Sequence, residues 1–388
     1  MLKILKKSKI SNARLGRLET GHGVIQTPFF MPDATRAVLK NVSVSELKKL
    51  KTPAIVINTY HLYLQPKMNI IKKAGGVHKF MSWEAPVLSD SGGFQVFSLI
   101  HKNKKFSSSL VGLKQMGKIH KDKVEFKSPL DGSRHELTPE KSIQIQFDLK
   151  TDMMVCLDDC PPNNDPEKVS AAVERTISWA KRCKKEYERQ VKKRKLNKKS
   201  QPLLFGVVQG GMDKKLRKQC ADELIKIGFD GLGYGARPVD DQGVFLKDIL
   251  RFTAQSIPEN YIRFGLGIGM PEDIVQCVKM GWDMFDCVIP TREARHGRLY
   301  IRQRKGIKGL KGKFYDMINI ANTKFAKDFK PINADSRFPE LKKYTKAYLH
   351  YLFKINEPLG QRLAILNNLE FYFDLMKMIR LSINKGEF

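Results

Sequence analysis

The stretch Met284-Phe285-Asp286-Cys287-Val288-Ile289 is a short apolar run that carries a single carboxylate, Asp286. Runs of this length and composition are typical of strands that are buried on both faces, as in a parallel sheet. Seven similar runs precede it along the chain. Together the eight strand-like runs are Pro28–Met31, Ala54–Asn58, Pro86–Asp90, Met153–Asp158, Leu203–Gln209, Gly231–Gly235, Arg263–Gly269 and Met284–Ile289.

Helix signals alternate with these runs. The segments Thr138-Pro139-Glu140, Asp165-Pro166-Glu167 and Pro271-Glu272-Asp273 each combine a helix-starting proline with acidic residues of a first turn. Eight strands joined by helices predict an α/β fold of the (β/α)8 TIM barrel type. An open, doubly wound sheet shows the same alternation, so the pattern alone leaves closure of the sheet open.

Two polar segments and the C-terminal region depart from the alternation. Residues 101–127 predict an insertion over the strand ends, and residues 181–199, with eleven basic and two acidic side chains, predict a solvated helix end and loop. We predict a catalytic barrel over residues 1–300 with these two insertions. Residues 301–388 are predicted to form a small C-terminal helical subdomain, with helices near Leu341–Phe353, Leu359–Leu366 and Phe371–Ile383.

Charge is the strongest compositional signal, with 70 Lys and Arg against 40 Asp and Glu and a net charge of +30. Such an excess predicts a nucleic-acid partner, because neutralised phosphates release their counterions, although an adaptation for solubility is the alternative. The six cysteines form no Cys-x-x-Cys pair, and the chain shows neither a signal peptide nor an apolar run of membrane-spanning length. We therefore expect a cytoplasmic protein with reduced thiols and no membrane partner.

Polar residues gather where the predicted strands end. Asp90, Asp158, Gln209 and Asp286 all lie at or near carboxyl ends of strands, the face of a barrel where active sites form. Taken singly, an acid at such a position commonly caps the following helix. Two carboxylates facing one anomeric carbon, however, support retaining glycosyl transfer, with one as nucleophile and the other as acid and then base. The convergence of several acids on one face favours this chemistry.

Six motifs resemble those of the tRNA-guanine transglycosylases, in that family's order and spacing. The resemblance covers residues 10–388 and rests on Asn58–Leu62, Asp90–Gln95, Ser128–Gly132, Leu157–Asp159, Val208–Gly211 and Asp283–Arg292. It implies a (β/α)8 pentosyltransferase that acts in queuosine biosynthesis. Such an enzyme exchanges guanine at the wobble position of tRNAs with a G-U-N anticodon for a 7-deazaguanine base. The target base has to leave its stack in a single-stranded loop.

The resemblance also implies roles for residues at matching positions. Asp286 is the expected nucleophile, which forms a covalent ribosyl-aspartate intermediate, and Asp90 is the expected general acid and base. Arg292 and Arg295 are expected to bind tRNA. Phe94 and Leu266 are expected to sandwich the base, whose polar edge is expected to meet Asp158, Gln209, Ser91, Gly235 and Ala236.

The chain departs from the family pattern at the zinc site. Members usually carry Cys-x-Cys-x-x-Cys after the barrel and a histidine about 26 residues later, whereas Ser336, Phe338, Leu341 and Asn367 occupy these positions here. Side chains of these types do not form a tetrahedral zinc site. We therefore expect no zinc and no other cofactor, with apolar packing by Phe338 and Leu341 in place of the metal. The family forms homodimers through this region, so a homodimer is implied but the oligomeric state stays open.

A second departure concerns the incoming base. The segment Gly235-Ala236-Arg237-Pro238-Val239 stands where many relatives have Gly-Gly-Leu-Ala-Val. Cys160 and Val239 match the bacterial type that accepts preQ1, while preQ0 and queuine remain open. Two other readings stay in competition: a non-catalytic RNA-binding paralogue, which the intact acids oppose, and a transglycosylase acting on DNA or on archaeal tRNA.

Overall fold

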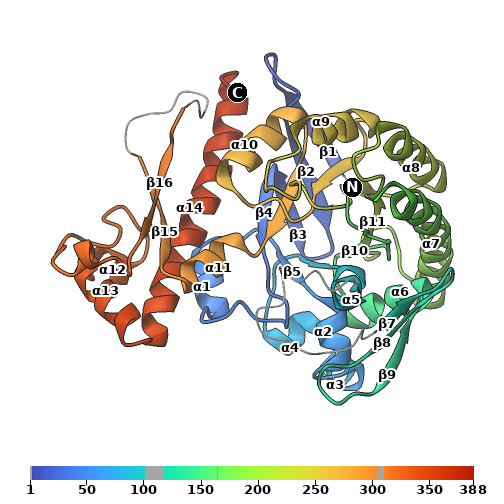
Figure 1. Ribbon diagram of the computed structural model, residues 1–388, viewed down its shortest axis with the longest axis horizontal. Coiled ribbons are helices and arrows are strands. Elements are labelled where there is room, and N and C mark those ends of the chain that lie inside the picture. The colour runs from blue at the N-terminus through green and yellow to red at the C-terminus, as the bar shows by residue number, and fades with distance from the viewer. Residues whose placement is uncertain (1, 101–116, 164, 304–309, 311) are drawn as a thin grey trace.

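A parallel eight-stranded sheet forms the centre of the molecule (Figure 1). The computed structural model describes residues 2–388 apart from 101–116, 164, 304–309 and 311. The strands are β4 (Phe29–Pro32), β5 (Ile55–Ile57), β6 (Val87–Ser89), β10 (Met153–Val155), β11 (Leu203–Val208), β12 (Gly231–Tyr234), β13 (Ile262–Gly265) and β14 (Met284–Cys287). All eight fall on the runs expected from the sequence. Several end earlier than expected, because the polar residues at their carboxyl ends leave the sheet and form loops.

The sheet closes into a barrel between its first and last strands. Its order is β4-β14-β13-β12-β11-β10-β6-β5. Asp33 forms a parallel bridge with Val56, and the backbone amide of Ala34 donates to the carbonyl of Val56 at 2.7 Å. This contact joins β4 to β5, so neither strand is left as a free edge. The predicted TIM barrel is confirmed, and the open doubly wound alternative is wrong.

Helices surround the barrel and begin where the sequence predicted them. The side chains of Thr138 and Asp165 cap α6 and α7 by accepting the backbone amides of Lys141 and Lys168, both at 3.1 Å. The outer helices are α1 (Val44–Lys49), α2 (Thr59–Leu64), α3 (Met68–Lys73), α4 (Val77–Met81), α5 (Gly93–Ile100), α6 (Pro139–Leu149), α7 (Pro166–Lys193), α8 (Lys214–Ile227), α9 (Lys247–Ser256), α10 (Pro271–Met280) and α11 (Ile289–Arg295). None of the described helices has both the length and the apolar character needed to cross a bilayer.

The two polar segments take different forms. Residues 181–193 are the second half of α7, and the loop that follows holds the rest of the basic run. The segment 101–127 lies partly outside the described residues, which resume at 117. From there a three-stranded antiparallel sheet is formed by β7 (Gly117–Ile119), β8 (Val124–Lys127) and β9 (Arg134–Leu137).

Alternating side chains divide the apolar core into an inner and an outer layer. In β11, Phe205 and Val207 pack inside the barrel, whereas Leu204 and Val208 pack against the helices. The period of two follows from the pleat of a strand. An antiparallel sheet of β1 (Leu2–Lys7), β2 (Arg14–Thr20) and β3 (Gly23–Thr27) adds Leu18 and Ile25 to the inner cluster. This sheet therefore closes the barrel interior at the end where the strands begin.

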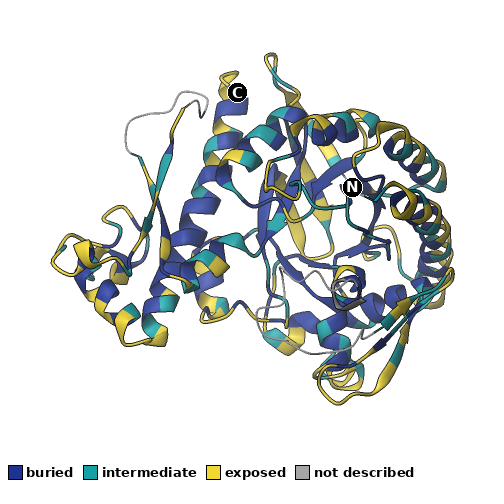
Figure 2. Ribbon diagram, in the orientation of Figure 1, coloured by how far each residue is buried: buried dark blue, intermediate teal, exposed yellow. Residues whose placement is uncertain are grey.

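The described part of the C-terminal region contains a hairpin, a short 3-10 helix (Thr323–Phe325) and three α-helices. The hairpin is β15 (Arg298–Arg302) with β16 (Tyr315–Asn319), and the helices are α12 (Pro339–Lys343), α13 (Lys346–Lys354) and α14 (Pro358–Lys385). The last two helices expected from the sequence are thus one continuous helix. Its second half packs on the barrel, where the Tyr372 hydroxyl donates to the Gly269 carbonyl at 2.5 Å and Arg380 donates to the Pro28 carbonyl at 2.6 Å. Figure 2 shows α14 largely buried between the hairpin region and the barrel.

Candidate active site

The two predicted catalytic acids, Asp90 and Asp286, and the predicted base-binding Asp158 lie at one end of the barrel, which we call the mouth, where the carboxyl ends of the strands meet. Asp90 follows β6, Asp158 lies three residues beyond β10, and Asp286 is on β14. All three are half-buried. The strand order separates Asp286 from Asp90 by only β4 and β5, so the two lie on adjoining parts of the rim.

Asp90 is held by groups from the loop after β5. Its Oδ1 accepts the backbone amides of Thr59 at 2.9 Å and Gly92 at 3.0 Å, and its Oδ2 accepts the amide of Asn58. Burial nevertheless raises the pKa of Asp90 to about 7, and the negative charges of Asp33 and Asp286 add to the rise against the opposing hydrogen bonds. A carboxyl that is positioned by several donors and titrates near neutrality is suited to both giving and taking a proton.

Asp286 has fewer partners. Its Oδ1 accepts the backbone amide of Gly267 at 3.1 Å. Burial raises the pKa of Asp286 to about 7, and the charge of Asp33 raises it further against that hydrogen bond. Only backbone amides donate to this carboxylate among the described residues, which leaves it without a side-chain donor and available for attack on a substrate carbon.

Asp33 is a fourth mouth carboxylate, which the sequence reasoning missed. It follows β4, between the strand that carries Asp286 and the strand before Asn58, and Thr35 donates to it at 2.6 Å. Burial raises the pKa of Asp33, against the hydrogen bonds from Thr35 and the charge of Arg295. The rule that picked out the other strand-end acids could have found it, since it stands directly after an expected strand.

Asp158 and Gln209 form the predicted base-reading pair. The Gln209 amide nitrogen donates to Asp158 Oδ2 at 2.7 Å. Burial raises the pKa of Asp158 to about 6, against this hydrogen bond. Gly235 gives them room, because a Cβ there would lie 2.5 Å from the Gln209 amide nitrogen. The neighbouring Ala236 has a φ of 89°, a left-handed value that glycine adopts more easily.

The predicted apolar and turn residues are placed around this pair. Phe94 is 57% exposed on the first turn of α5, so its ring is free to meet a ligand. Leu266 packs partly against the inner core, and its Cδ1 fills the space beside Gly233. Ser91 is buried, and its hydroxyl accepts the backbone amide of Gly93 at 3.2 Å, so in this structure it supports the turn.

The two predicted tRNA-binding arginines extend from α11, directly after β14. Arg292 is exposed and lies near Glu293 at 3.4 Å, an ion pair that solvent weakens. Arg295 is half-buried, and burial lowers its pKa while the charge of Asp33 opposes the shift. Positive charge thus stands beside the carboxylates at the mouth.

The positions of the family's zinc ligands hold another kind of contact. The Ser336 hydroxyl and the Arg337 backbone amide donate to the Glu370 carboxylate at 2.5 and 2.7 Å. Asn367 donates to the Tyr300 carbonyl at 3.1 Å. Phe338 and Leu341 are buried. This set offers zinc neither thiolate nor imidazole, so the donor chemistry does not fit the metal.

A second cluster of titratable groups lies where the strands begin. Asp152 Oδ1 is 2.8 Å from His22 Nδ1, and Asp152 Oδ2 is 3.1 Å from His78 Nε2. The two imidazole rings are stacked, with centroids 3.6 Å apart and planes inclined by 15°. Nearly parallel rings do not aim their in-plane lone pairs at one point, so the cluster is better suited to sharing protons than to chelating a metal. Burial alone would raise the pKa of Asp152. The hydrogen bonds from His22, His78 and Val87 outweigh this effect and bring the pKa down to about 2.

Comparison with known proteins gives a consistent result over the whole length. The family model described as queuine tRNA-ribosyltransferase matches residues 9–388. A queuine tRNA-ribosyltransferase from Halothermothrix orenii is 42% identical over 383 residues, which cover 98% of this chain and 93% of the relative. Those from Thermoanaerobacter sp. (strain X514) and Staphylococcus epidermidis are 42% and 39% identical, over 99% and 98% of this chain and 93% and 92% of the relatives.

Proposed function

This chain belongs to the queuine tRNA-ribosyltransferase family, and from that premise we propose how the mouth of its barrel exchanges a base in tRNA. As a member it is a pentosyltransferase, a tRNA-guanine transglycosylase of queuosine synthesis. The proposed substrates are the wobble guanine of tRNAs with a G-U-N anticodon and an incoming 7-deazaguanine base. The observation that carries the proposal is the pair Asp90 and Asp286, which share one mouth and each have a pKa of about 7.

In the first step the ionised Asp286 attacks C1′ of the wobble ribose. A bond forms between its oxygen and C1′, the bond from C1′ to guanine N9 breaks, and its electron pair leaves with the base. Asp90 in its acid form gives a proton to the departing guanine. The step therefore requires Asp286 to be ionised while Asp90 is protonated. Two interacting carboxyls with pKa values near 7 share one proton at neutral pH and so provide this state.

In the second step the incoming base loses its N9 proton to the Asp90 carboxylate. Its nitrogen attacks C1′, and the ester bond to Asp286 breaks with return of the electron pair to the carboxylate. Two displacements at the same carbon retain its configuration. The anion on Asp286 is stabilised at both ends of the cycle by the amide of Gly267.

Base recognition is proposed to rest on Asp158 and Gln209. Their hydrogen bond fixes a carboxylate and an amide side by side, an acceptor and donor set that matches the polar edge of a guanine-like ring. We propose preQ1 as the incoming base because Cys160 and Val239 match the bacterial type. Burial raises the pKa of the Cys160 thiol to about 12, so this part of the site stays uncharged and small.

Base exchange is tested by incubating the protein with labelled guanine and an unmodified G-U-N tRNA transcript, followed by competition with preQ1, preQ0 and queuine. Incorporation that preQ1 suppresses most strongly is expected. A transcript with adenine at the wobble position and the variant Asp158→Asn serve as controls. Absence of label in the wobble-guanine transcript would refute the proposed base exchange. Stronger competition by queuine than by preQ1 would refute the choice of preQ1 as the incoming base.

We also propose that the C-terminal region folds without zinc. Hydrogen bonds of Ser336 and Arg337 to Glu370, the Asn367 contacts and the buried Phe338 and Leu341 support it. Metal analysis of purified protein is expected to find far less than one zinc per chain, and a chelator is expected to leave the melting temperature unchanged. One equivalent of tightly bound zinc would contradict this proposal.

A further inference from the structure

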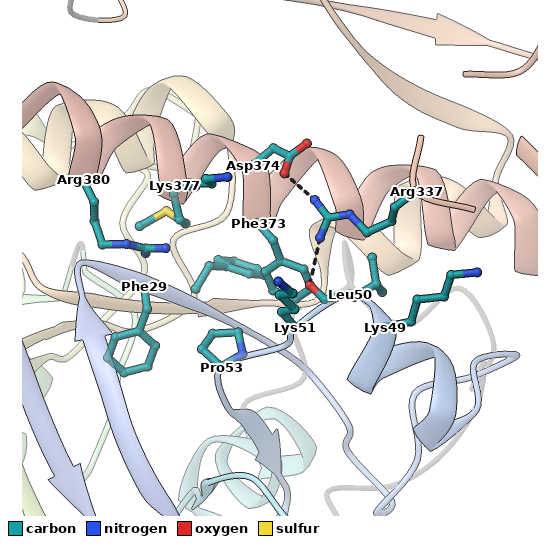
Figure 3. Close-up of a pocket in the computed structure, with 12 residues that line it drawn as sticks. Phe29, Lys49, Leu50, Lys51, Pro53, Arg337, Phe373, Asp374, Lys377 and Arg380 are labelled. Carbon is teal, nitrogen blue, oxygen red and sulfur yellow. Dashed lines mark hydrogen bonds and ion pairs between the residues drawn. The ribbon is translucent and has the colours of Figure 1, made fainter. Parts of the chain in front are cut away.

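A cavity of about 490 Å³ lies between the loop from α1 to β5 and the second half of α14 (Figure 3). Phe29 and Pro53 line it at the beginning of β4 and just ahead of β5. Asp33 and the other mouth acids lie at or beyond the opposite ends of the strands. The cavity is therefore separate from the candidate active site.

Positive charge dominates the lining of this cavity. Five basic side chains and one carboxylate face it: Lys49, Lys51, Arg337, Lys377, Arg380 and Asp374. The carboxylate is already engaged, because Asp374 Oδ1 accepts from the Arg337 guanidinium at 2.6 Å. Arg337 also pairs with Glu370 at 2.9 Å. Arg337 thus belongs to the links that replace the zinc site, and the other cations remain for a ligand.

Four cations on the wall lack a carboxylate partner within the described part of the chain, and one of them, Lys49, lies over the Phe338 ring at 4.7 Å from its centroid. Lys51 and Lys377 are exposed, and Arg380 is half-buried with one guanidinium nitrogen donating to the Pro28 carbonyl at 2.6 Å. Burial alone lowers the pKa of Arg380 to about 10, since no negative charge opposes it. A partly desolvated cation without a counter-charge is costly to fold, and a bound anion would offset that cost.

We propose that this cavity binds a phosphate group. A phosphate offers several oxygens on different sides, so Lys51 from the loop and Lys377 and Arg380 from successive turns of α14 could contact it together. Charge-assisted hydrogen bonds of this kind are strong, and the guanidinium fork matches phosphate geometry. The phosphate could be a free oligophosphate or part of an RNA backbone, and both present the same chemistry to these three side chains.

The test must separate this cavity from the general attraction of a chain with net charge +30 for any anion. Pyrophosphate binding is measured by calorimetry for the wild type, for Lys51→Gln with Lys377→Gln, and for Lys192→Gln with Lys193→Gln. The last pair removes the same charge from exposed positions at the end of α7. The cavity variant is expected to bind at least about tenfold more weakly, and the α7 variant less than about twofold.

Equal weakening in both variants, or no saturable binding by the wild type, would overturn the proposal. Melting temperatures show whether the variants fold, and the single exposed change Lys377→Glu provides a second variant with the same expected loss. Binding of an unmodified tRNA distinguishes the source. Weaker tRNA binding by the cavity variant, with competition by pyrophosphate, identifies a backbone phosphate, whereas unchanged tRNA affinity identifies a free anion.

The proposal does not depend on base exchange. Asp286→Asn is expected to bind pyrophosphate with wild-type affinity, because Asp286 lies at the mouth. Loss of one activity therefore leaves the other measurable.

Discussion

The two ends of the barrel hold carboxylates in opposite electrostatic states, buried ones where the strands begin and half-buried ones at the mouth. Where the strands begin, Asp152 is surrounded by donors from His22, His78 and Val87, and Asp283 pairs with Arg14 at 2.6 and 2.8 Å. At the mouth, burial and the negative charge of Asp33 raise the pKa values of Asp90 and Asp286 to about 7. The pKa of Asp152 is instead brought down to about 2.

The difference separates acids that stabilise the fold from acids for which we propose a chemical role. Compensated carboxylates tie the N-terminal sheet to the barrel: the His22 amide and ring join β2 and β3 to Asp152. Asp90 and Asp286 accept hydrogen bonds from amides but have no cationic partner among the described residues that lowers their pKa values. Their ionisation therefore lowers the free energy of unfolding as the pH rises from the unfolded pKa near 4 to the folded value near 7, and this loss remains at higher pH. Substitution at the two ends should therefore have opposite effects on stability and activity.

The largest expected effect is at the nucleophile. Asp286→Asn should lower kcat for base exchange by a factor on the order of 10⁴ and abolish the covalent RNA adduct, because an amide is a poor nucleophile. The unfolding free energy at pH 8 should stay equal or rise, since an uncompensated buried charge is removed. Activity is followed by guanine incorporation and stability by urea unfolding. An adduct that persists in the variant would remove Asp286 from this role.

The reverse pattern is expected at Asp152. Asp152→Ala should lower the unfolding free energy by about 3–5 kcal/mol, because it leaves buried histidine and backbone donors without their acceptor. Base exchange per folded molecule should remain close to that of the wild type. Urea unfolding and activity at 15 °C check the two parts. A variant as stable as the wild type would refute the contrast between the two ends.

A substitution at Asp33 is expected to shift the pH dependence of base exchange without abolishing it. Its charge raises the pKa values of both Asp90 and Asp286, so Asp33→Asn should lower both. The profile of kcat/KM against pH is expected to be bell-shaped around neutrality, and both limbs should move to lower pH by on the order of half a unit. Thr35→Val, which removes a hydrogen bond to Asp33 without removing its charge, is the control. A profile that does not move would show that Asp33 has no influence on the pair.

The smallest effect is expected at His22, whose side chain is 41% exposed. The hydrogen bond to Asp152 raises the pKa of His22 against the opposing effect of burial. The stabilisation of the fold by protonated His22 is therefore complete below the unfolded pKa near 6.5, and it is lost as the pH rises through the folded pKa. His22→Ala should lower the free energy of unfolding by about 0.5 kcal/mol at pH 5.5 and by less at pH 9. The effect is small because solvent screens this partly exposed pair. An equal cost at both pH values would mean that protonation does not matter to this contact.

Local patterns were sufficient for much of the fold. The apolar runs and the capping residues Thr138 and Asp165 gave the strands and helix starts, because these signals depend on neighbouring residues alone. Asp158 and Gln209, which we propose to recognise the base, are 51 positions apart in the chain; the barrel mouth was expected to bring them together, and their side chains are joined by a hydrogen bond of 2.7 Å. Asp33 was missed because no motif contained it.

The sequence by itself determined the eight strands, the order of the chemistry-bearing residues and the residue types at the positions expected for zinc ligands, since each can be read within a short window. Only the tertiary structure decided that the sheet closes through Asp33 and Val56, and that α14 returns to the barrel. It also decided that His22, His78 and Asp152 meet. These features depend on contacts between segments that are far apart in the chain. The same contacts decide how deeply each carboxylate is buried and which of them lie next to histidine or arginine side chains.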